Sequence, residues 1–202
     1  MGLVSRGGVH SQQEHLHALV DEVTRAGVND CVIHAFTDGR DTAPNMGTTY
    51  LGDLEAHIAG SNVRIASVHG RYFAMDRDKR WERIAPSYAA LTGAVDAKHP
   101  NAVAGVQAHY DQGVTDEFVE PFQIEGVDGV VRPGDVVLCF NFRTDRCREI
   151  TQALTQEAIE EHGMSPLELH YVTMTNYDDS FNCVHVLLSL IHISEPTRPV
   201  PI

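Results

Sequence analysis

The residues of this chain whose type and spacing suggest chemistry are arginines in three short clusters. Arg40 lies in TDGRDT, Arg71 and Arg77 lie in GRYFAMDRDKRW, and Arg143 and Arg146 lie in FNFRTDR. Each cluster directly follows an apolar run that is typical of a β-strand. The planar guanidinium group binds phosphate and carboxylate through paired hydrogen bonds. The clusters therefore predict a site for a small phosphorylated or carboxylated molecule.

Two further residues are candidates beside these arginines. His10 follows two glycines in SRGGVHS, just before an expected helix, where free backbone N–H groups favour an anion. A surface histidine beside a turn is the alternative for His10. In TDGRDT, Arg40 could hold an anionic group while Asp41 accepts a hydrogen bond from a hydroxyl or acts as a base. An ordinary Asp-Gly turn with a local ion pair is the alternative for this cluster.

The other arginines also have alternatives. Arg77 belongs to a run of alternating charges over residues 76–80, which is also typical of a solvated face. Arg71 is closer to its strand and is the better candidate of the two. Arg143 and Arg146 are three positions apart and become neighbours if a helix has begun there, where an anion would relieve their repulsion. The nearby acids Asp145 and Glu149 are the alternative partners. This last cluster is the strongest, because it follows the most apolar strand of the chain.

Alternating strand and helix patterns must position these side chains. Strands are expected over 31–36, 62–69, 136–142 and 167–175, and helices over 48–59, 81–91, about 102–112 and about 145–161. Ser11 to Glu14 reads as a capping box, Gly27 as a helix stop, and 118–135 as a hairpin. Parallel strands end at one edge of a sheet, so distant clusters can meet there.

The fold class that follows is α/β. We predict a three-layer domain with a mostly parallel sheet flanked by helices. Gly2 to Val4 reads as the stump of a strand, so we expect the domain to be truncated at its N-terminal edge.

Composition narrows the function classes. The formal net charge of −13 argues against non-specific nucleic-acid binding, and no apolar run approaches the ~20 residues that span a bilayer. No signal peptide follows Met1. The four cysteines form no CxxC pair, which favours reduced thiols in a reducing compartment. We therefore expect a cytoplasmic protein with no nucleic-acid or membrane partner.

Four segments in order carry a specific resemblance. GLVSRGGVHS, HAFTDGRDT, GRYFAMDRDKRWER and FNFRTDRCREI resemble the cofactor-independent phosphoglycerate mutase family, over about Gly2 to Phe181. That family has a metal-bearing phosphatase domain, split in sequence by an inserted phosphotransferase domain. Residues 1–183 are similar to the insert, without its first segment.

The resemblance implies a substrate and a division of labour. The family interconverts 3-phosphoglycerate and 2-phosphoglycerate in glycolysis. Asp41 would contact the glycerate hydroxyls and serve as the base that prepares them. The residues that would bind substrate phosphate and carboxylate are His10, Arg40, Arg71, Arg77, Arg143 and Arg146.

Other parts of the family's active centre have no counterpart here. The nucleophilic serine and the ligands of two manganese ions belong to the phosphatase domain, which would be the partner in cis. We therefore expect no cofactor on this segment and no mutase activity from it alone. A second departure is Arg6, where the family motif usually has Asp.

Two questions remain open at this point. The leading interpretation is an enzyme segment that holds the glycerate, and the alternative is a stand-alone, non-catalytic module that binds phosphorylated sugar acids. Phosphatase-domain motifs in the flanking DNA would favour the first. Residues 184–202 form a predicted tail, either disordered or artefactual, because Leu188 to Arg198 resembles a translated sequencing-library adapter.

Overall fold

The larger of two β-sheets carries most of the loops of interest. The computed structural model describes residues 1–188. The sheet has the strand order β1-β2-β3-β5-β4. Its strands are β1 (Gly2–Leu3), β2 (Cys31–Thr37), β3 (Val63–Gly70), β5 (Phe122–Ile124) and β4 (Lys98–His99). Neighbouring strands are parallel except β3 and β5, which are antiparallel.

The smaller sheet continues from the edge of the first. It consists of β6 (Val136–Cys139), β7 (His170–Thr173) and β8 (Val184–Val186), all parallel. The N–H of Phe140 donates to the Met1 carbonyl at 3.0 Å, and the Met1 amino group donates to the Leu138 carbonyl at 2.7 Å. The end of β6 therefore lies beside β1, and its loop reaches the same region as the loop after β1.

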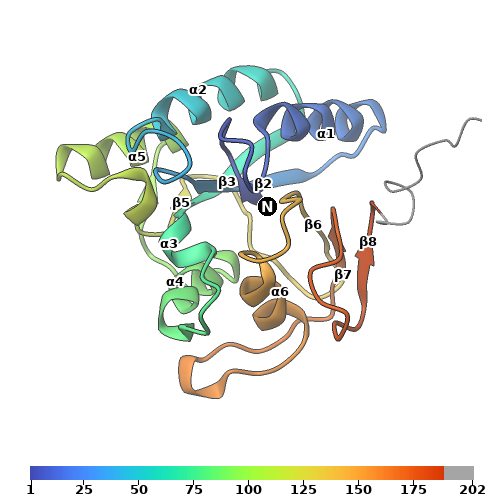
Figure 1. The fold of residues 1–202 in the computed structure, drawn as a ribbon. Helices are drawn as coiled ribbons and strands as arrows, with labels where there is room; N and C mark the ends of the chain where they lie inside the picture. The colour runs from blue at the N-terminus through green and yellow to red at the C-terminus, as the bar shows by residue number, and fades with distance from the viewer. Residues whose placement is uncertain (189–202) are drawn as a thin grey trace, which may run out of the picture.

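Helices cover both faces of these strands (Figure 1). They are α1 (Gln13–Arg25), α2 (Gly47–Ile58), α3 (Arg71–Ala74), α4 (Trp81–Leu91), α5 (Ala102–Asp111) and α6 (Arg148–Thr155), with 3₁₀ turns at Asp116–Phe118 (η1) and Glu160–His162 (η2). Side chains alternate between the faces of a strand, so Ala35 and Phe36 of β2 enter different hydrophobic clusters. The Ala35 cluster contains residues of α1, α2 and α5, and the Phe36 cluster contains residues of α4 and α6. The predicted mostly parallel α/β fold with three layers is confirmed.

Several local predictions need correction. Ser11 does not cap α1, because its hydroxyl donates to the Leu3 carbonyl and Gln12 occupies the N-cap without a side-chain bond. The predicted hairpin over 118–135 is wrong, since β5 pairs with β3 and β4 on either side. Helix α6 begins only at Arg148, after the cluster that carries Arg143 and Arg146. Those two arginines are therefore loop residues.

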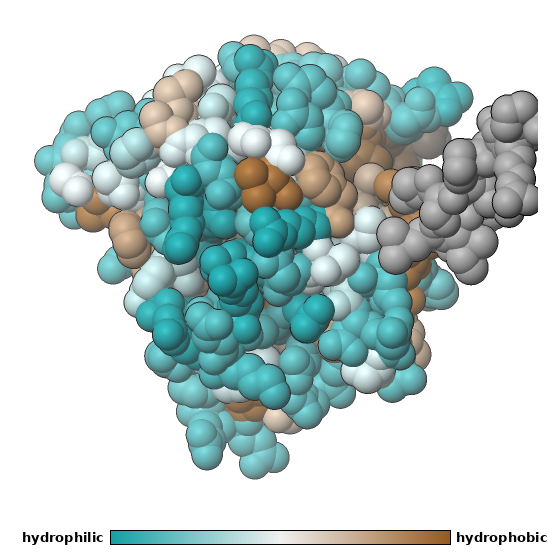
Figure 2. All heavy atoms as spheres, in the orientation of Figure 1, coloured by the Kyte–Doolittle hydropathy of each residue, from teal (hydrophilic) through white to brown (hydrophobic). Residues whose placement is uncertain are grey.

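The face of the molecule seen in Figure 1 is covered mainly by hydrophilic residues (Figure 2). Within residues 1–188, no helix is long and apolar enough to cross a membrane. Strand β8 occupies the first residues of the predicted tail, and residues 189–202 lie outside the described part of the chain.

Candidate anion-binding site

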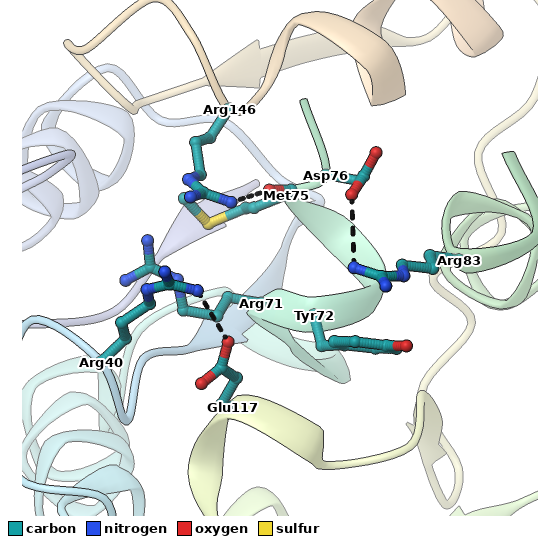
Figure 3. A pocket seen from close by; sticks show the side chains of 8 residues that line it. All are labelled: Arg40, Arg71, Tyr72, Met75, Asp76, Arg83, Glu117 and Arg146. Atoms are coloured by element: carbon teal, nitrogen blue, oxygen red, sulfur yellow. Dashed lines mark hydrogen bonds and ion pairs between the residues drawn. The ribbon is translucent and has the colours of Figure 1, made fainter. Parts of the chain in front are cut away.

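The carboxyl ends of four parallel strands deliver the predicted residues to one region. Each of β1, β2, β3 and β6 is followed by a segment that carries at least one of them. Figure 3 shows the side chains of Arg40, Arg71 and Arg146 pointing toward one another from three of these segments. The seven residues predicted from the sequence are His10, Arg40, Asp41, Arg71, Arg77, Arg143 and Arg146. Hydrogen bonds and ion pairs described below connect six of them, and Arg146 lines one pocket with Arg40 and Arg71.

Arg71 is the buried centre of the site, with 3% of its side chain exposed. It begins α3 directly after β3, and its Nη1 donates to Asp38 Oδ1 and Asp41 Oδ2, both at 2.6 Å. Burial opposes the charged guanidinium, but the bonds to Asp41 and Asp38 raise the pKa of Arg71 above its ordinary value. Arg71 is therefore a fixed positive charge.

Asp38 organises the loop after β2. Its Oδ1 also accepts from the N–H groups of Arg40 at 3.2 Å and Asp41 at 3.0 Å, and its Oδ2 accepts from the Ser5 hydroxyl at 2.5 Å. Burial favours the neutral form, yet the hydrogen bonds from Asp41, Ser5 and Arg71 keep the pKa of Asp38 below its usual range. A buried carboxylate thus sets the backbone that carries Arg40 and Asp41.

Asp116 of η1 holds the far end of the same loop. Its Oδ2 accepts from the N–H groups of Met46 and Gly47, each at 2.8 Å, and its N–H donates to the Pro44 carbonyl at 2.9 Å. A Cβ at Gly47 would collide with Asp116 Oδ1, so this approach needs glycine. Burial raises the pKa of Asp116. The 38–47 loop is therefore fixed at both ends by buried carboxylates.

Two arginines reach into the pocket above Arg71. Arg40 is 56% exposed and pairs with Glu117 at 3.3 Å, an interaction of a kind that contributes little in water. Arg146 Nη1 donates to the Met75 carbonyl at 3.2 Å, and no carboxylate of the described residues lies within ion-pair distance of it. Burial, followed by the charges of Arg71 and two other arginines, lowers the pKa of Arg146. An incoming anion would relieve this repulsion.

His10 lies under the loop between β6 and α6. Only 3% of its side chain is exposed, and its carbonyl accepts from the N–H groups of Phe142 at 2.9 Å and Arg143 at 3.3 Å. Its Nε2 lies 3.7 Å from Asp41 Oδ2, and its Nδ1 lies 3.5 Å from Asp145 Oδ1. Burial, with help from the charge of Arg71, lowers the pKa of His10 to about 4. The imidazole is therefore neutral at pH 7.

Asp145 connects the remaining arginines. Its Oδ2 pairs with Arg77 at 3.2 Å, and its Oδ1 pairs with Arg143 Nε at 3.2 Å. Both arginines are about half exposed. They flank the site from two segments, and each can turn toward a bound anion because exposed pairs of this kind are weak.

The pocket itself has about 260 Å³ of empty space, counted out to its open mouth. It is lined by Arg40, Arg71, Tyr72, Met75, Asp76, Arg83, Glu117 and Arg146 (Figure 3). Three of the predicted residues therefore line the pocket. Asp41 joins them through Arg71, His10 lies beside Asp41, and Arg77 and Arg143 join through Asp145.

Sequence reasoning missed the acidic residues that position the arginines. Asp38 was visible in TDGRDT, where a carboxylate before Gly-Arg-Asp could have indicated a side chain that binds the backbone of its own loop. Asp116 and Glu117 are far away in sequence and gave no signal. Arg6, which departs from the family pattern, pairs with Glu14 at 3.5 Å and Asp53 at 3.2 Å over α1 and α2. Its charge therefore does not enter the pocket.

Metal ligands are a separate question. Among the described residues, no group of three or more His, Cys, Asp or Glu side chains could hold a metal ion.

Comparison with known proteins gives the family. The model described as "BPG-independent PGAM N-terminus" matches residues 1–179. The chain belongs to this family. It is 47% identical over 201 residues to the 2,3-bisphosphoglycerate-independent phosphoglycerate mutase of Flavobacterium johnsoniae, covering 96% of this chain and 39% of that protein. The mutase of the same name from Bacteroides fragilis is 47% identical over 188 residues, covering 93% of this chain and 37% of that protein.

A solved structure agrees with the sequence relatives. A crystal structure of Leishmania mexicana phosphoglycerate mutase at low cobalt concentration matches with a TM-score of 0.79 and 31% identity, over 88% of this chain and 35% of that one. This member of the BPG-independent PGAM N-terminus family thus spans about two fifths of the length of the curated relatives that it matches. The resemblance inferred from the four motifs is confirmed.

Proposed function

We propose that this chain is the substrate-holding part of a phosphoglycerate mutase that interconverts 3-phosphoglycerate and 2-phosphoglycerate. The observation that carries the proposal is the convergence of Arg40, Arg71 and Arg146 on one pocket, with Arg146 lacking any acidic partner among the described residues. A small molecule with a phosphate and a carboxylate would supply the missing negative charge. Arg77 and Arg143, which pair with Asp145 beside the site, would add further contacts to the same ligand.

The carboxylate of Asp41 has the geometry of a base for the glycerate hydroxyls. Its Oδ2 is bound by Arg71, whereas no donor of the described residues bonds to its Oδ1. The side chain is 18% exposed, so Oδ1 can reach a ligand. Neutral His10 beside it can donate one N–H to an oxygen of the substrate without adding charge. Holding the hydroxyl, the carboxylate and the phosphate together would supply the orientation that a transfer reaction requires.

The transfer itself needs groups beyond these residues. By family resemblance, a phosphatase domain joined in cis would supply the serine and bind two manganese ions. We therefore expect the 202-residue chain to bind the glycerate without converting it. The measurement is turnover of 3-phosphoglycerate by the purified chain with manganese added. Formation of 2-phosphoglycerate above the blank would contradict this part of the proposal.

Binding is tested by titration calorimetry with 3-phosphoglycerate. Removing a charge-assisted hydrogen-bond donor should weaken binding by about 10- to 100-fold, since such bonds contribute roughly 1.5–3 kcal/mol. Arg146→Ala should show that loss. Arg25→Ala is the matched control, because Arg25 pairs with Glu22 on the surface of α1 and should leave affinity unchanged. Silence of the folded wild-type chain, or equal affinity of both variants, would overturn the proposal.

A further inference from the structure

Two buried carboxyl groups lie between the segments that carry Arg77 and Arg146. Glu149 is the second residue of α6, three positions after Arg146, and Asp76 directly precedes Arg77. Both residues are 4% exposed. Neither was assigned a role above, and both belong to segments whose placement decides where the flanking arginines point.

Each carboxyl group binds the backbone of residues 78–80. Glu149 Oε1 accepts from the N–H of Lys79 at 2.7 Å. Asp76 Oδ2 accepts from the N–H groups of Asp78 at 2.9 Å and Arg80 at 3.0 Å. Glu149 therefore ties α6 to the loop after α3, across 70 positions of sequence. Lys79 has a φ of 57°, a conformation that such bonds must stabilise in a non-glycine residue.

The second oxygen of Glu149 has a different neighbour. Oε2 is buried and receives no hydrogen bond from the described N–H and O–H donors. The carboxyl group of Asp76 lies within hydrogen-bonding range of the Glu149 carboxyl group. Two ionised carboxylates in that contact would repel, whereas one proton between them makes a hydrogen bond. Burial, followed by Asp76 and Asp78, raises the pKa of Glu149 to about 7.

The surrounding charges determine which carboxyl group keeps the proton. Arg83 of α4 lies 3.6 Å from Asp76 Oδ1, and Arg80 and Asp78 follow on the loop. Despite burial, the two backbone bonds and Arg83 keep the pKa of Asp76 low. Glu149 receives one backbone bond, and no cation of residues 1–188 lies within ion-pair distance of it, so Glu149 is the protonated partner.

We propose that Glu149 is a positioning residue that shares a proton with Asp76 and thereby holds the Arg77 loop against the segment of Arg146. The proposal rests on the function proposed above for these arginines. When the proton leaves, the two carboxylates repel and the 78–80 loop moves away from α6. The grip on the phosphorylated ligand should then weaken as the pH rises through neutrality.

The primary test is hydrogen exchange of the Lys79 amide in the full 202-residue chain. In the wild-type chain, the protection factor should fall by about ten-fold between pH 6 and 8.5. Glu149→Gln keeps an acceptor for Lys79 and offers Asp76 a permanent donor, so its protection factor should stay constant. Glu149→Ala should lose protection at every pH. Glu161→Gln removes an equal charge from an exposed position of η2 and should behave as the wild type.

Calorimetry with 3-phosphoglycerate at the same pH values is the second measurement. Relative to Glu149→Gln, the wild-type chain should lose about ten-fold in affinity by pH 8.5. The ratio of the two affinities at each pH removes the effect of the titration of the ligand itself. Equal exchange profiles in the wild type and Glu149→Gln would refute the shared proton. Different exchange profiles with equal affinity profiles would refute the positioning role. Absence of ligand binding at every pH would refute the proposed function and, with it, the positioning role. The exchange data would still test whether Glu149 and Asp76 share a proton.

Discussion

Arg71 joins Asp38 and Asp41 through a single nitrogen, Nη1, which lies 2.6 Å from a carboxylate oxygen of each. The two acids differ in exposure, because Asp38 is buried and Asp41 is 18% exposed. One carboxylate therefore anchors the guanidinium in the core, and the other is held at the surface of the site. This arrangement separates the structural acid from the acid that can meet a ligand.

Asp38→Ala should destabilise the fold strongly. The substitution leaves the buried guanidinium of Arg71 with one partner and frees two backbone N–H groups and the Ser5 hydroxyl. Breaking a buried ion pair typically lowers the free energy of unfolding by about 3–5 kcal/mol. Urea denaturation measures the loss. The control is Asp30→Ala, whose carboxylate pairs with Arg64 at the surface and should change stability by less than about 1 kcal/mol.

His10 should make the fold sensitive to acid. Its folded pKa of about 4 lies below the ordinary pKa of 6.5, so the unfolded chain binds more protons between these values. The contribution of His10 to stability is therefore complete above pH 6.5 and is lost as the pH falls toward 4. Its slope is about 1.4 kcal/mol per pH unit.

His10→Gln removes one group that binds a proton on unfolding. The slope of the unfolding free energy against pH should therefore fall by about 1.4 kcal/mol per pH unit in that window. Urea denaturation at half-unit intervals from pH 4 to 7 gives both slopes. Parallel curves for the wild type and the variant would show that the pKa of His10 is the same in the folded and unfolded chain, contrary to the buried imidazole described here.

Ser67→Ala should break a buried polar chain between the two central strands. The Ser67 hydroxyl lies 2.7 Å from His34 Nδ1 and 2.6 Å from His69 Nε2, and all three side chains are buried. Alanine leaves two imidazole nitrogens without that partner, at about 1–3 kcal/mol each. Thermal or urea unfolding should show a loss of about 3 kcal/mol. Ser180→Ala, on an exposed loop, is the neutral control, and an equal effect of the two substitutions would contradict the role of the chain.

Helices and strands with clear periodicity were predictable from the sequence. Apolar spacing located α4 at 81–91 as observed, and β2 and β3 to within about a residue. Local rules failed where a distant partner competed. Ser11 prefers the Leu3 carbonyl to its own helix, and β5 joins two strands rather than a hairpin partner, because tertiary hydrogen bonds satisfied those groups instead.

For the site, the sequence alone determined which cations take part and which strands they follow, because arginine clusters after apolar runs are local patterns. It also determined the family, through four ordered motifs. Only the tertiary structure decided which acids hold those cations. Asp116 is 70 and 69 positions from the Met46 and Gly47 N–H groups that it binds, and Glu117 is 77 positions from Arg40.

The tertiary structure likewise decided the protonation of the site, since burial sets it and burial is a property of the packed chain. His10 is neutral because α/β packing removes it from water, and burial, followed by Asp76, raises the pKa of Glu149 to about 7. Residue types fixed what each group can do. The arrangement of strand ends, which brings distant segments within a few ångströms, decided what each group does.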